Sequence, residues 1–213
     1  MRRKKVRKEM IWFTSDMHLG HERVLEFTSR PWEKIEEMNQ AFISNINDKV
    51  KEEDELYILG DYSFKMTALE AAALRKKIVC KRVHIVPGNH DKDWTNSLVA
   101  GAFIVELPIT VLKENKRKFV LSHFPMADWQ SMSHSSIHLH GHIHSEGSTY
   151  NEMNRMQGLY RYDVGVDANG YAPVSMDEIL EWFEGVECTG RVKWKNWVDA
   201  TGNKKVRRKL AGL

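Results

Sequence analysis

Cysteine is scarce in this chain of 213 residues, with Cys80 and Cys188 as its only two examples. So small a number excludes a disulfide framework and a cysteine-rich zinc site, and it fits a reducing compartment. No apolar run approaches the roughly 20 residues that cross a bilayer, which excludes a predicted membrane span. The basic N-terminus also lacks the long apolar region and the cleavage site of a signal peptide. We therefore expect a cytoplasmic protein.

The composition is that of an ordinary globular protein, with 42% hydrophobic and 29% charged residues. The length fits one domain with a full core. The net charge of +3 is small, but basic residues gather at both ends of the chain. We expect a domain over residues 10–185, a basic N-terminal tail over 1–9 and a basic C-terminal extension over 186–213. The two ends either contact nucleic acid or are simply solvated.

Short apolar runs rich in β-branched and aromatic residues alternate with segments of helical periodicity in the first half of the chain. This alternation is typical of right-handed βαβ crossovers and a parallel sheet. The pattern over 103–123 predicts strands joined by tight turns, so we expect the second half to be more antiparallel. Ser175 and Glu178 predict a capping box at the start of a helix over 175–185. The predicted strands span 10–15, 55–60, 82–88 and 118–123, and the predicted helices of the first half span 21–27, 32–50 and 67–78.

Residues that commonly bind metal ions follow each predicted strand. Ligands of open α/β sheets bind beyond the carboxyl ends of the strands, so we expect these side chains to converge. Imidazoles mixed with carboxylates suit Zn²⁺, Mn²⁺ or Fe rather than Ca²⁺ or Mg²⁺. Seven candidates are too many for one tetrahedral site, whereas two ions about 3.5 to 4 Å apart that share a carboxylate would use them all. The candidates are Asp16, His18, Asp61, Asn89, His123, His142 and His144, and Asp61 is the expected bridge because it stands alone after its strand.

The spacing within these motifs has a geometric meaning. In Asp-x-His, side chains two positions apart in an extended segment point the same way, so Asp16 and His18 could bind one ion together. His142 and His144 have the same spacing and could do likewise. A glycine, which permits a sharp turn and a close approach of the backbone, precedes three of the ligand positions at 60, 88 and 141.

Five short motifs, in this order along the chain, resemble those of the calcineurin-like metallophosphoesterases. They are DMH (16–18), GD (60–61), GNHD (88–91), SH (122–123) and GHIH (141–144). The resemblance implies an α/β fold, a four-layer α/β/β/α sandwich with two mixed β-sheets and a dimetal site at the C-terminal ends of the strands. The segments 13–32 and 164–179 look like a small bacterial and phage-associated group of phosphoesterases whose substrate is uncertain.

The resemblance also implies a role for each candidate residue. Asp61 would bridge two divalent ions (Mn, Fe, Zn or Ni), and His90 would be the catalytic residue beside them without binding either. His138 and His140 would belong to the strand that delivers the last motif. The implied reaction is hydrolysis of a phosphodiester or phosphomonoester by a hydroxide that bridges the ions. One ion would be held by Asp16, His18 and His144, and the other by Asn89, His123 and His142.

The chain departs from one branch of this family. Protein phosphatases of this fold follow the Gly-Asp motif with an Asp that orients the catalytic His and then an Arg that binds phosphate. Phe64 stands at that Asp position here, which argues against a protein serine/threonine phosphatase. The residue that orients His90 is therefore open, with Asp91 the nearest carboxylate. His21 and Arg30 are candidate substrate contacts, and a surface or helix-capping role is the alternative for each.

Several functions stay open at this point. The substrate is a small or nucleotide-like phosphoester, or it is DNA or RNA held by the basic termini of a nuclease, whose binding would weaken steeply with salt. A non-catalytic binding scaffold is a third possibility, although the complete ligand set and His90 argue against it. The oligomeric state is not determined. Asp163, Asp167 and Asn169 follow another predicted strand but match no metal motif, so we expect a structural turn there.

Overall fold

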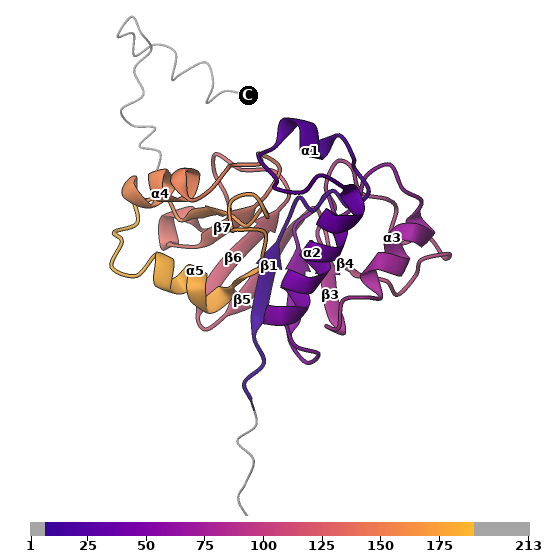
Figure 1. Ribbon diagram of the computed structural model, residues 1–213. Coiled ribbons are helices and arrows are strands. Elements are labelled where there is room, and N and C mark those ends of the chain that lie inside the picture. Colours follow the sequence, from indigo (N-terminus) through magenta and orange to yellow (C-terminus); the bar gives the residue numbers. More distant parts are fainter. Residues whose placement is uncertain (1–6, 190–213) are drawn as a thin grey trace, which may run out of the picture.

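The computed structural model describes residues 7–189, so most of the two basic ends, for which nucleic-acid contact is one alternative, lies outside the described residues. Two β-sheets lie face to face between two layers of helices (Figure 1). This arrangement confirms the predicted α/β sandwich with two mixed sheets. On the side of the first sheet lie α2 (Ile35–Lys49) and α3 (Ala68–Arg75), with the short α1 (Val24–Phe27) beyond the strand ends, and on the side of the second sheet lie α4 (Thr149–Met156) and α5 (Met176–Trp182).

The first sheet has the strand order β4-β3-β2-β1-β9. Its first four strands are mutually parallel, as the strand–helix alternation predicts, and β9 pairs antiparallel to β1. Because the parallel strands run the same way, their carboxyl ends meet at one edge. The strands are β1 (Ile11–Thr14), β2 (Glu55–Ile58), β3 (Arg82–Ile85), β4 (Ile104–Val105) and β9 (Val174–Ser175).

The second sheet has the strand order β5-β6-β7-β8. The predicted hairpin is present between β5 and β6, and its turn is only Asn115-Lys116, both with positive φ. The second half is more antiparallel than the first through this hairpin and the β1–β9 pair, but β6–β7 and β7–β8 are parallel and are not joined by tight turns. The chain crosses over between those strands instead of turning back. The strands are β5 (Ile109–Glu114), β6 (Arg117–Ser122), β7 (Ile137–His140) and β8 (Arg161–Asp163), and the short 3-10 helix η1 (Met132–His134) precedes β7.

Alternate residues of the central strands fill two separate cores. Trp12 of β1 packs with Phe42 of α2 on the helix side of the first sheet. The next residue, Phe13, points between the sheets and stacks at 6.3 Å on Phe119 of β6. This alternation follows from the two-residue period of a strand. It fixes the register of the strands, and so the positions at which each one delivers its polar end residues.

The predicted capping box at Ser175 is confirmed. The Ser175 hydroxyl accepts a hydrogen bond from the Glu178 backbone N–H, and the Glu178 carboxylate accepts one from the Ser175 backbone N–H. Thr67 and Glu70 form the same motif at the start of α3. Each box satisfies backbone donors that a helix start leaves free. These helices therefore begin where the local sequence specifies.

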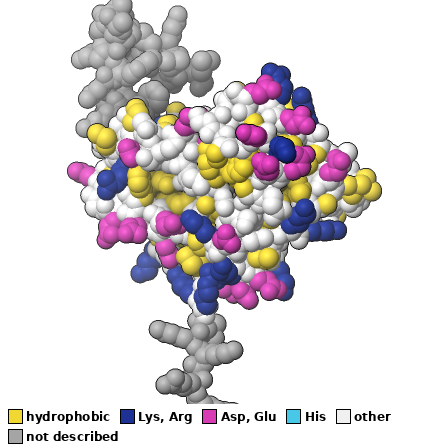
Figure 2. Space-filling model, viewed as in Figure 1, with side chains coloured by type: hydrophobic (Ala, Val, Ile, Leu, Met, Phe, Trp, Pro, Cys, Tyr) yellow, Lys and Arg dark blue, Asp and Glu magenta, His cyan; other side chains and the backbone are white. Residues whose placement is uncertain are grey.

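The ends of the described chain contact the body. Arg7 and Glu9, which sequence assigns to the N-terminal tail, form ion pairs with Asp54 at 2.7 Å and with Arg82 at 2.6 Å. At the other end, the Thr189 hydroxyl donates a hydrogen bond to the Gln157 carbonyl at 2.6 Å. On the face in Figure 2, basic and acidic side chains are interspersed, most densely at the end where β1 begins. None of the helices among residues 7–189 combines the length and hydrophobicity needed to span a membrane.

Asp54, just before β2, accepts hydrogen bonds that link the amino ends of β1 and β2. The carboxylate is fully buried and accepts hydrogen bonds from the Arg7 guanidinium, the Trp12 indole and two backbone N–H groups. Burial alone would raise the pKa of Asp54, but these donors outweigh it and hold the pKa at about 2. Since this is below the value of about 3.9 in an unfolded chain, the carboxylate stabilises the fold above pH 4, and this contribution disappears as the pH falls through 2.

We expect Asp54→Asn to lower the free energy of unfolding by about 2 kcal/mol at pH 7. The difference from the wild type should shrink as the pH falls from 4 to 2, because the wild-type carboxylate becomes protonated in that range. Urea denaturation of both proteins at pH 7, 4 and 3 measures this. A difference that stays constant over the whole range would show that the charge of Asp54 contributes nothing.

Candidate metal centre

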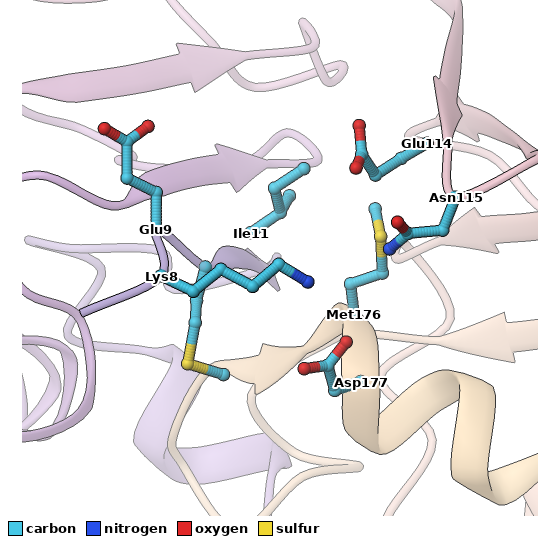
Figure 3. Close-up of a pocket in the computed structure, with 8 residues that line it drawn as sticks. Lys8, Glu9, Ile11, Glu114, Asn115, Met176 and Asp177 are labelled. Atoms are coloured by element: carbon cyan, nitrogen blue, oxygen red, sulfur yellow. The ribbon is translucent and has the colours of Figure 1, made fainter. Parts of the chain in front are cut away.

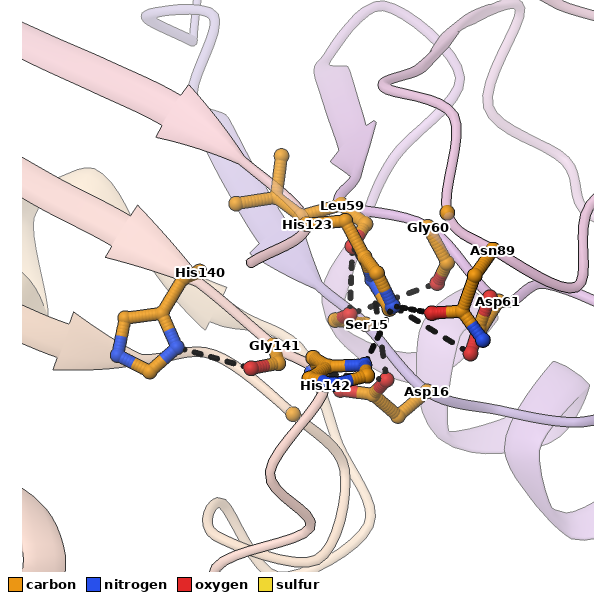
Figure 4. Close-up of polar contacts among 12 residues, drawn as sticks. Ser15, Asp16, Leu59, Gly60, Asp61, Asn89, His123, His140, Gly141 and His142 are labelled. Atoms are coloured by element: carbon orange, nitrogen blue, oxygen red, sulfur yellow. Dashed lines mark hydrogen bonds and ion pairs between the residues drawn. The ribbon is translucent and has the colours of Figure 1, made fainter. Parts of the chain in front are cut away.

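Histidine and aspartate side chains from four strand ends, those of β1, β2, β6 and β7, converge beyond the carboxyl edges of the two sheets. They form two groups, in each of which one possible ligand atom per residue lies within 4.8 Å of the others. Figure 4 shows Asp61, His123 and His142 with their neighbours, among the loops that follow the strands. The first group is Asp16, His18 and His144, and the second is Asp61, His123 and His142.

The ring nitrogens of the second group lie close to one another and to Asn89 (Figure 4). His123 Nε2 lies 3.2 Å from His142 Nδ1 and 2.9 Å from the side-chain oxygen of Asn89. Ligand atoms around a tetrahedral ion, with bonds of about 2.0–2.1 Å, lie roughly 3.3 Å apart. The spacing of these three atoms is close to that of a ligand shell, and Asn89 lies next to the group as a further candidate ligand.

Asp61, a member of the second group, also lies close to the first. Its Oδ2 is 3.4 Å from His18 Nε2 on one side and 3.4 Å from His123 Nε2 on the other. In the first group, His18 Nε2 is 3.1 Å from His144 Nε2. The other oxygen of Asp61 accepts a hydrogen bond from the His90 backbone N–H at 2.9 Å, which fixes the carboxylate in this orientation. One oxygen of Asp61 is thus available to both groups at the same distance.

The local backbone is not the extended chain that the Asp-x-His spacing suggests. Strand β1 ends at Thr14, and both Asp16 (φ 60°) and His18 (φ 50°) have left-handed backbone conformations. Asp61, His142 and His144 also have positive φ, so five candidate ligands are among the eleven such non-glycine residues of the described chain. Left-handed residues are uncommon and cluster at functional sites, where the surrounding structure imposes them. Tight turns, not strand geometry, bring these side chains together.

Two glycines allow the motif loops to approach each other this closely. Gly60 has a φ of +88°, and a Cβ there would lie 2.5 Å from His123 Nδ1. A Cβ on Gly141 would overlap the Ser15 hydroxyl and the Asp16 carboxylate. A side chain at either position would push the loops apart. The glycines before the ligands are therefore required by the packing of the site, as their positions in the sequence indicate.

The protonation states suit cation binding. Burial lowers the pKa of His18 to about 3, so this ring is neutral near pH 7. Burial acts to raise the pKa of Asp61, but the contacts with His123 outweigh it and bring the pKa to about 2. Neutral imidazoles and carboxylates are the forms that bind metal ions. Three residues are exceptions. Complete burial raises the pKa of Asp16 to about 7. The contacts of His123 with Asp61 and of His144 with Asp167 outweigh burial and raise the pKa of both rings.

The second ring nitrogen of two histidines is held by a hydrogen-bond acceptor. His123 Nδ1 donates to the Leu59 carbonyl at 2.9 Å, and His144 Nδ1 donates to Asp167 Oδ2 at 2.8 Å. In each ring the other nitrogen, Nε2, then faces the candidate ligand group with its lone pair free. Ring orientation and tautomer of metal-binding histidines are commonly set in this way.

His90 lies at the side of the site. Its ring centroid is 5.5 Å from that of His18 and 4.6 Å from that of Phe64. Asp91, the nearest carboxylate in the sequence, faces away and accepts hydrogen bonds from the backbone N–H groups of Asp61, Tyr62 and Gly88. Asp91 therefore joins the GD and GNHD loops, while packing against Phe64 orients His90.

The two candidate substrate contacts differ in position. The His21 ring is half-buried against Phe64, with 4.4 Å between the ring centroids, and 5.6 Å from the His18 ring. The Arg30 side chain is fully buried and pairs with Asp167 at 2.7 Å. His21 thus borders the site, whereas the contacts of Arg30 give no support to a direct role with substrate.

His138 and His140 lie on β7, as expected for structural residues. His138 Nδ1 donates to the Val120 carbonyl, and its Nε2 accepts from the Met126 backbone N–H. His140 is also fully buried and donates to the Gly141 carbonyl. Neither belongs to a candidate ligand group. The four alternating histidines of residues 138–144 thus divide into two that pack in the second sheet and two that reach the site.

Asp167 is the residue that sequence reasoning undervalued. It follows β8 at the same edge of the sheet, and so carries the same signal as the other candidates, but its place in a DANG turn favours a structural interpretation. Asn169 does have a structural role, because its side chain donates to the carbonyls of Asp163 and Gly165. Asp167 instead holds His144. The sequence alone does not show whether Asp167 forms part of a turn or accepts a hydrogen bond from a candidate ligand.

Two hollows away from this edge contain none of the predicted site residues. One, near the start of β1, has a volume of about 30 Å³, room for about one water molecule (Figure 3). The other is an open depression of about 640 Å³ beside α5. The first is lined by Lys8, Glu9, Met10, Ile11, Glu114, Asn115, Met176 and Asp177.

The fold and the histidine, aspartate and asparagine side chains at its strand ends are together those of a metal-dependent phosphoesterase. The family model for the calcineurin-like phosphoesterases matches residues 10–185, most of the chain, and the chain belongs to this family.

Relatives known by sequence cover most of the chain. It is 27% identical over 175 residues to an uncharacterized protein of Methanocaldococcus jannaschii, MJ1445, with coverage of 82% of this chain and 91% of that protein. It is 28% identical over 203 residues to the gene 66 protein of Mycobacterium phage L5, with coverage of 80% and 92%. Among solved structures, the chain is similar to AQ665, a protein of unknown function from Aquifex aeolicus, with a TM-score of 0.64 and 24% sequence identity. The match covers 82% of this chain and 99% of AQ665, and it shows a likeness of fold.

Proposed function

We propose that this chain is a dinuclear metal-dependent phosphodiesterase that acts on a small or nucleotide-like ester. The observation that carries the proposal is the position of Asp61 Oδ2, 3.4 Å from a ring nitrogen of each ligand group. A single carboxylate oxygen placed equally between two histidine-rich groups fits a ligand shared by two ions. Two-ion sites that share ligands in this way are typical of enzymes that hydrolyse phosphate esters.

The proposed metal ligands are the members of the two groups, together with Asn89. Asp16, His18 and His144 would hold one ion, while Asn89, His123 and His142 would hold the other, with Asp61 between them. The mixture of imidazole, carboxylate and amide donors favours Mn, Fe, Zn or Ni over Ca²⁺ and Mg²⁺. When bound, the ions would lower the pKa of a water between them and polarise the oxygens of the phosphate.

His90 is the proposed general acid. Its backbone N–H is fixed on Asp61 Oδ1, and its half-buried ring lies against Phe64 and beside His18. The ring therefore has a defined position next to the ions without being needed to hold them. From there it would donate a proton to the leaving oxygen of the ester.

The surroundings of the site favour a diester with a flat apolar group. Phe124 is 49% exposed, and its ring centroid lies 4.5 Å from that of His142. Phe27 is 61% exposed, and its ring lies 5.6 Å from that of His21. Exposed aromatic rings at the edge of a site commonly stack on bases or similar groups. Arg30 is engaged with Asp167, so it is not offered to the additional negative charge of a phosphomonoester.

The experiment compares hydrolysis of bis-p-nitrophenyl phosphate and p-nitrophenyl phosphate by metal-stripped protein re-supplied with Mn²⁺, with Asp61→Asn as the blank. We expect faster turnover of the diester and none above background in the blank. Faster turnover of the monoester would contradict the diester preference. If neither ester is hydrolysed with any of Mn²⁺, Zn²⁺, Fe²⁺ or Ni²⁺, the catalytic proposal fails and a binding scaffold of the same fold becomes the better interpretation.

A further inference from the structure

Asp167 and Arg30 form a buried ion pair directly behind the first ligand group. Arg30 Nε and Nη2 donate to the two carboxylate oxygens of Asp167 at 2.7 and 2.8 Å. The side chains are 0% and 4% exposed. Such a bidentate pair has a fixed geometry, because the planar guanidinium matches the carboxylate.

Both members of the pair also contact the first ligand group. Asp167 Oδ2 accepts the hydrogen bond from His144 Nδ1 at 2.8 Å. Arg30 Nη2 donates to the backbone carbonyl of Asp16 at 2.7 Å, and Arg30 Nη1 donates to that of Met17 at 3.1 Å. The pair therefore connects the loop after β1 with the loop that carries His144. It reaches two of the three members of the first group.

The second group is supported differently. Its His123 donates to a backbone carbonyl, that of Leu59, and not to a side chain. Leu59 directly follows β2 in the first sheet, so this support does not depend on Asp167 or Arg30. The hydrogen bonds that hold the rings of His144 and His123 thus differ, and a change to the ion pair should affect His144 more than His123.

We propose that Asp167 and Arg30 are positioning residues that set the affinity of the first ligand group, and not of the second, for its metal ion. This inference rests on the proposed dinuclear function. Asp167 holds His144 in the tautomer whose Nε2 carries the lone pair, and its negative charge makes that nitrogen a better donor. Arg30 fixes Asp167 and the turn at Asp16 in one arrangement.

The test is a calorimetric titration of metal-stripped, full-length protein with Mn²⁺ alone. Wild-type protein is expected to bind two ions. Asp167→Asn should bind one ion with unchanged affinity and the other about 10- to 100-fold more weakly, the usual effect of losing such a partner. Asp54→Asn is the matched control, because Asp54 is an equally buried carboxylate paired with an arginine, at the opposite end of the strands. It should lose stability and keep both ions with wild-type affinity.

Asp167→Asn leaves the Arg30 charge buried without its partner, and this variant can fail to fold. The double variant Arg30→Met with Asp167→Asn removes both charges and should show the same selective weakening. Wild-type affinities at both sites in either folded variant, or equal weakening at both sites, would overturn the positioning role. A wild-type protein that binds fewer than two ions would be a distinct result, since it contradicts the dinuclear site itself and this inference with it.

Discussion

Asp61→Asn is expected to lose bound metal and activity together. Asparagine keeps the size of the side chain but removes the one charge that lies between the two groups, at 3.4 Å from His18 Nε2 and from His123 Nε2. Bound ions provide several kcal/mol of transition-state stabilisation in such enzymes, so turnover of bis-p-nitrophenyl phosphate should fall by more than about 1,000-fold.

The measurement combines metal content with initial rates of diester hydrolysis. Metal per chain is determined after dialysis by atomic emission, and fewer than two ions are expected in the variant. Asp54→Asn again provides the control, since it makes the same chemical change in a buried carboxylate far from the site. The proposed bridging role would be wrong if Asp61→Asn kept two ions per chain and near-normal turnover.

His90→Ala is expected to separate catalysis from metal binding. Loss of a general acid commonly slows turnover by about 10²- to 10⁴-fold. Metal should stay bound, because the contact of residue 90 with Asp61 is made by its backbone N–H, which alanine also has. The ring itself contacts Phe64 and His18 without belonging to either ligand group.

The same two measurements test this prediction, with His134→Ala as control. His134 is an exposed histidine in the short η1 helix, so its replacement removes an imidazole without touching the site. Turnover within a few-fold of wild type in His90→Ala would exclude His90 as the proton donor. Loss of metal together with activity would instead place His90 among the residues that hold the ions.

Much of the fold was predictable because its signals are local. Strands β1, β2 and β3 of the first sheet lie within the apolar runs that predict them, and the helix at Ser175 begins at its capping box. Strand pairing in the second sheet was not predictable, since the sequence between β6 and β7 carries no mark that distinguishes a crossover from a turn. Which strands lie side by side depends on contacts between residues far apart in the chain.

The candidate site also combines features that the sequence predicts with features that it does not. The identity of the ligand-type residues, their order and their positions after strands are properties of the sequence, and so is the Phe64 that stands beside His90. The two-residue spacing of His142 and His144 by itself suggests one shared face, whereas the family resemblance assigns them to different ions, and the structure places them in different groups. Both residues have left-handed backbone conformations, and only the ring of His142 falls in the group that contains Asp61.

The sequence by itself determined the fold class, the family and the set of polar residues that end the strands. Only the tertiary structure decided which of them meet, that Arg30 faces Asp167, and that Asp167 holds His144. The physical reason is distance along the chain. Periodicity and caps act over a few residues, whereas Arg30 and Asp167 are 137 positions apart and are joined only once both sheets have packed.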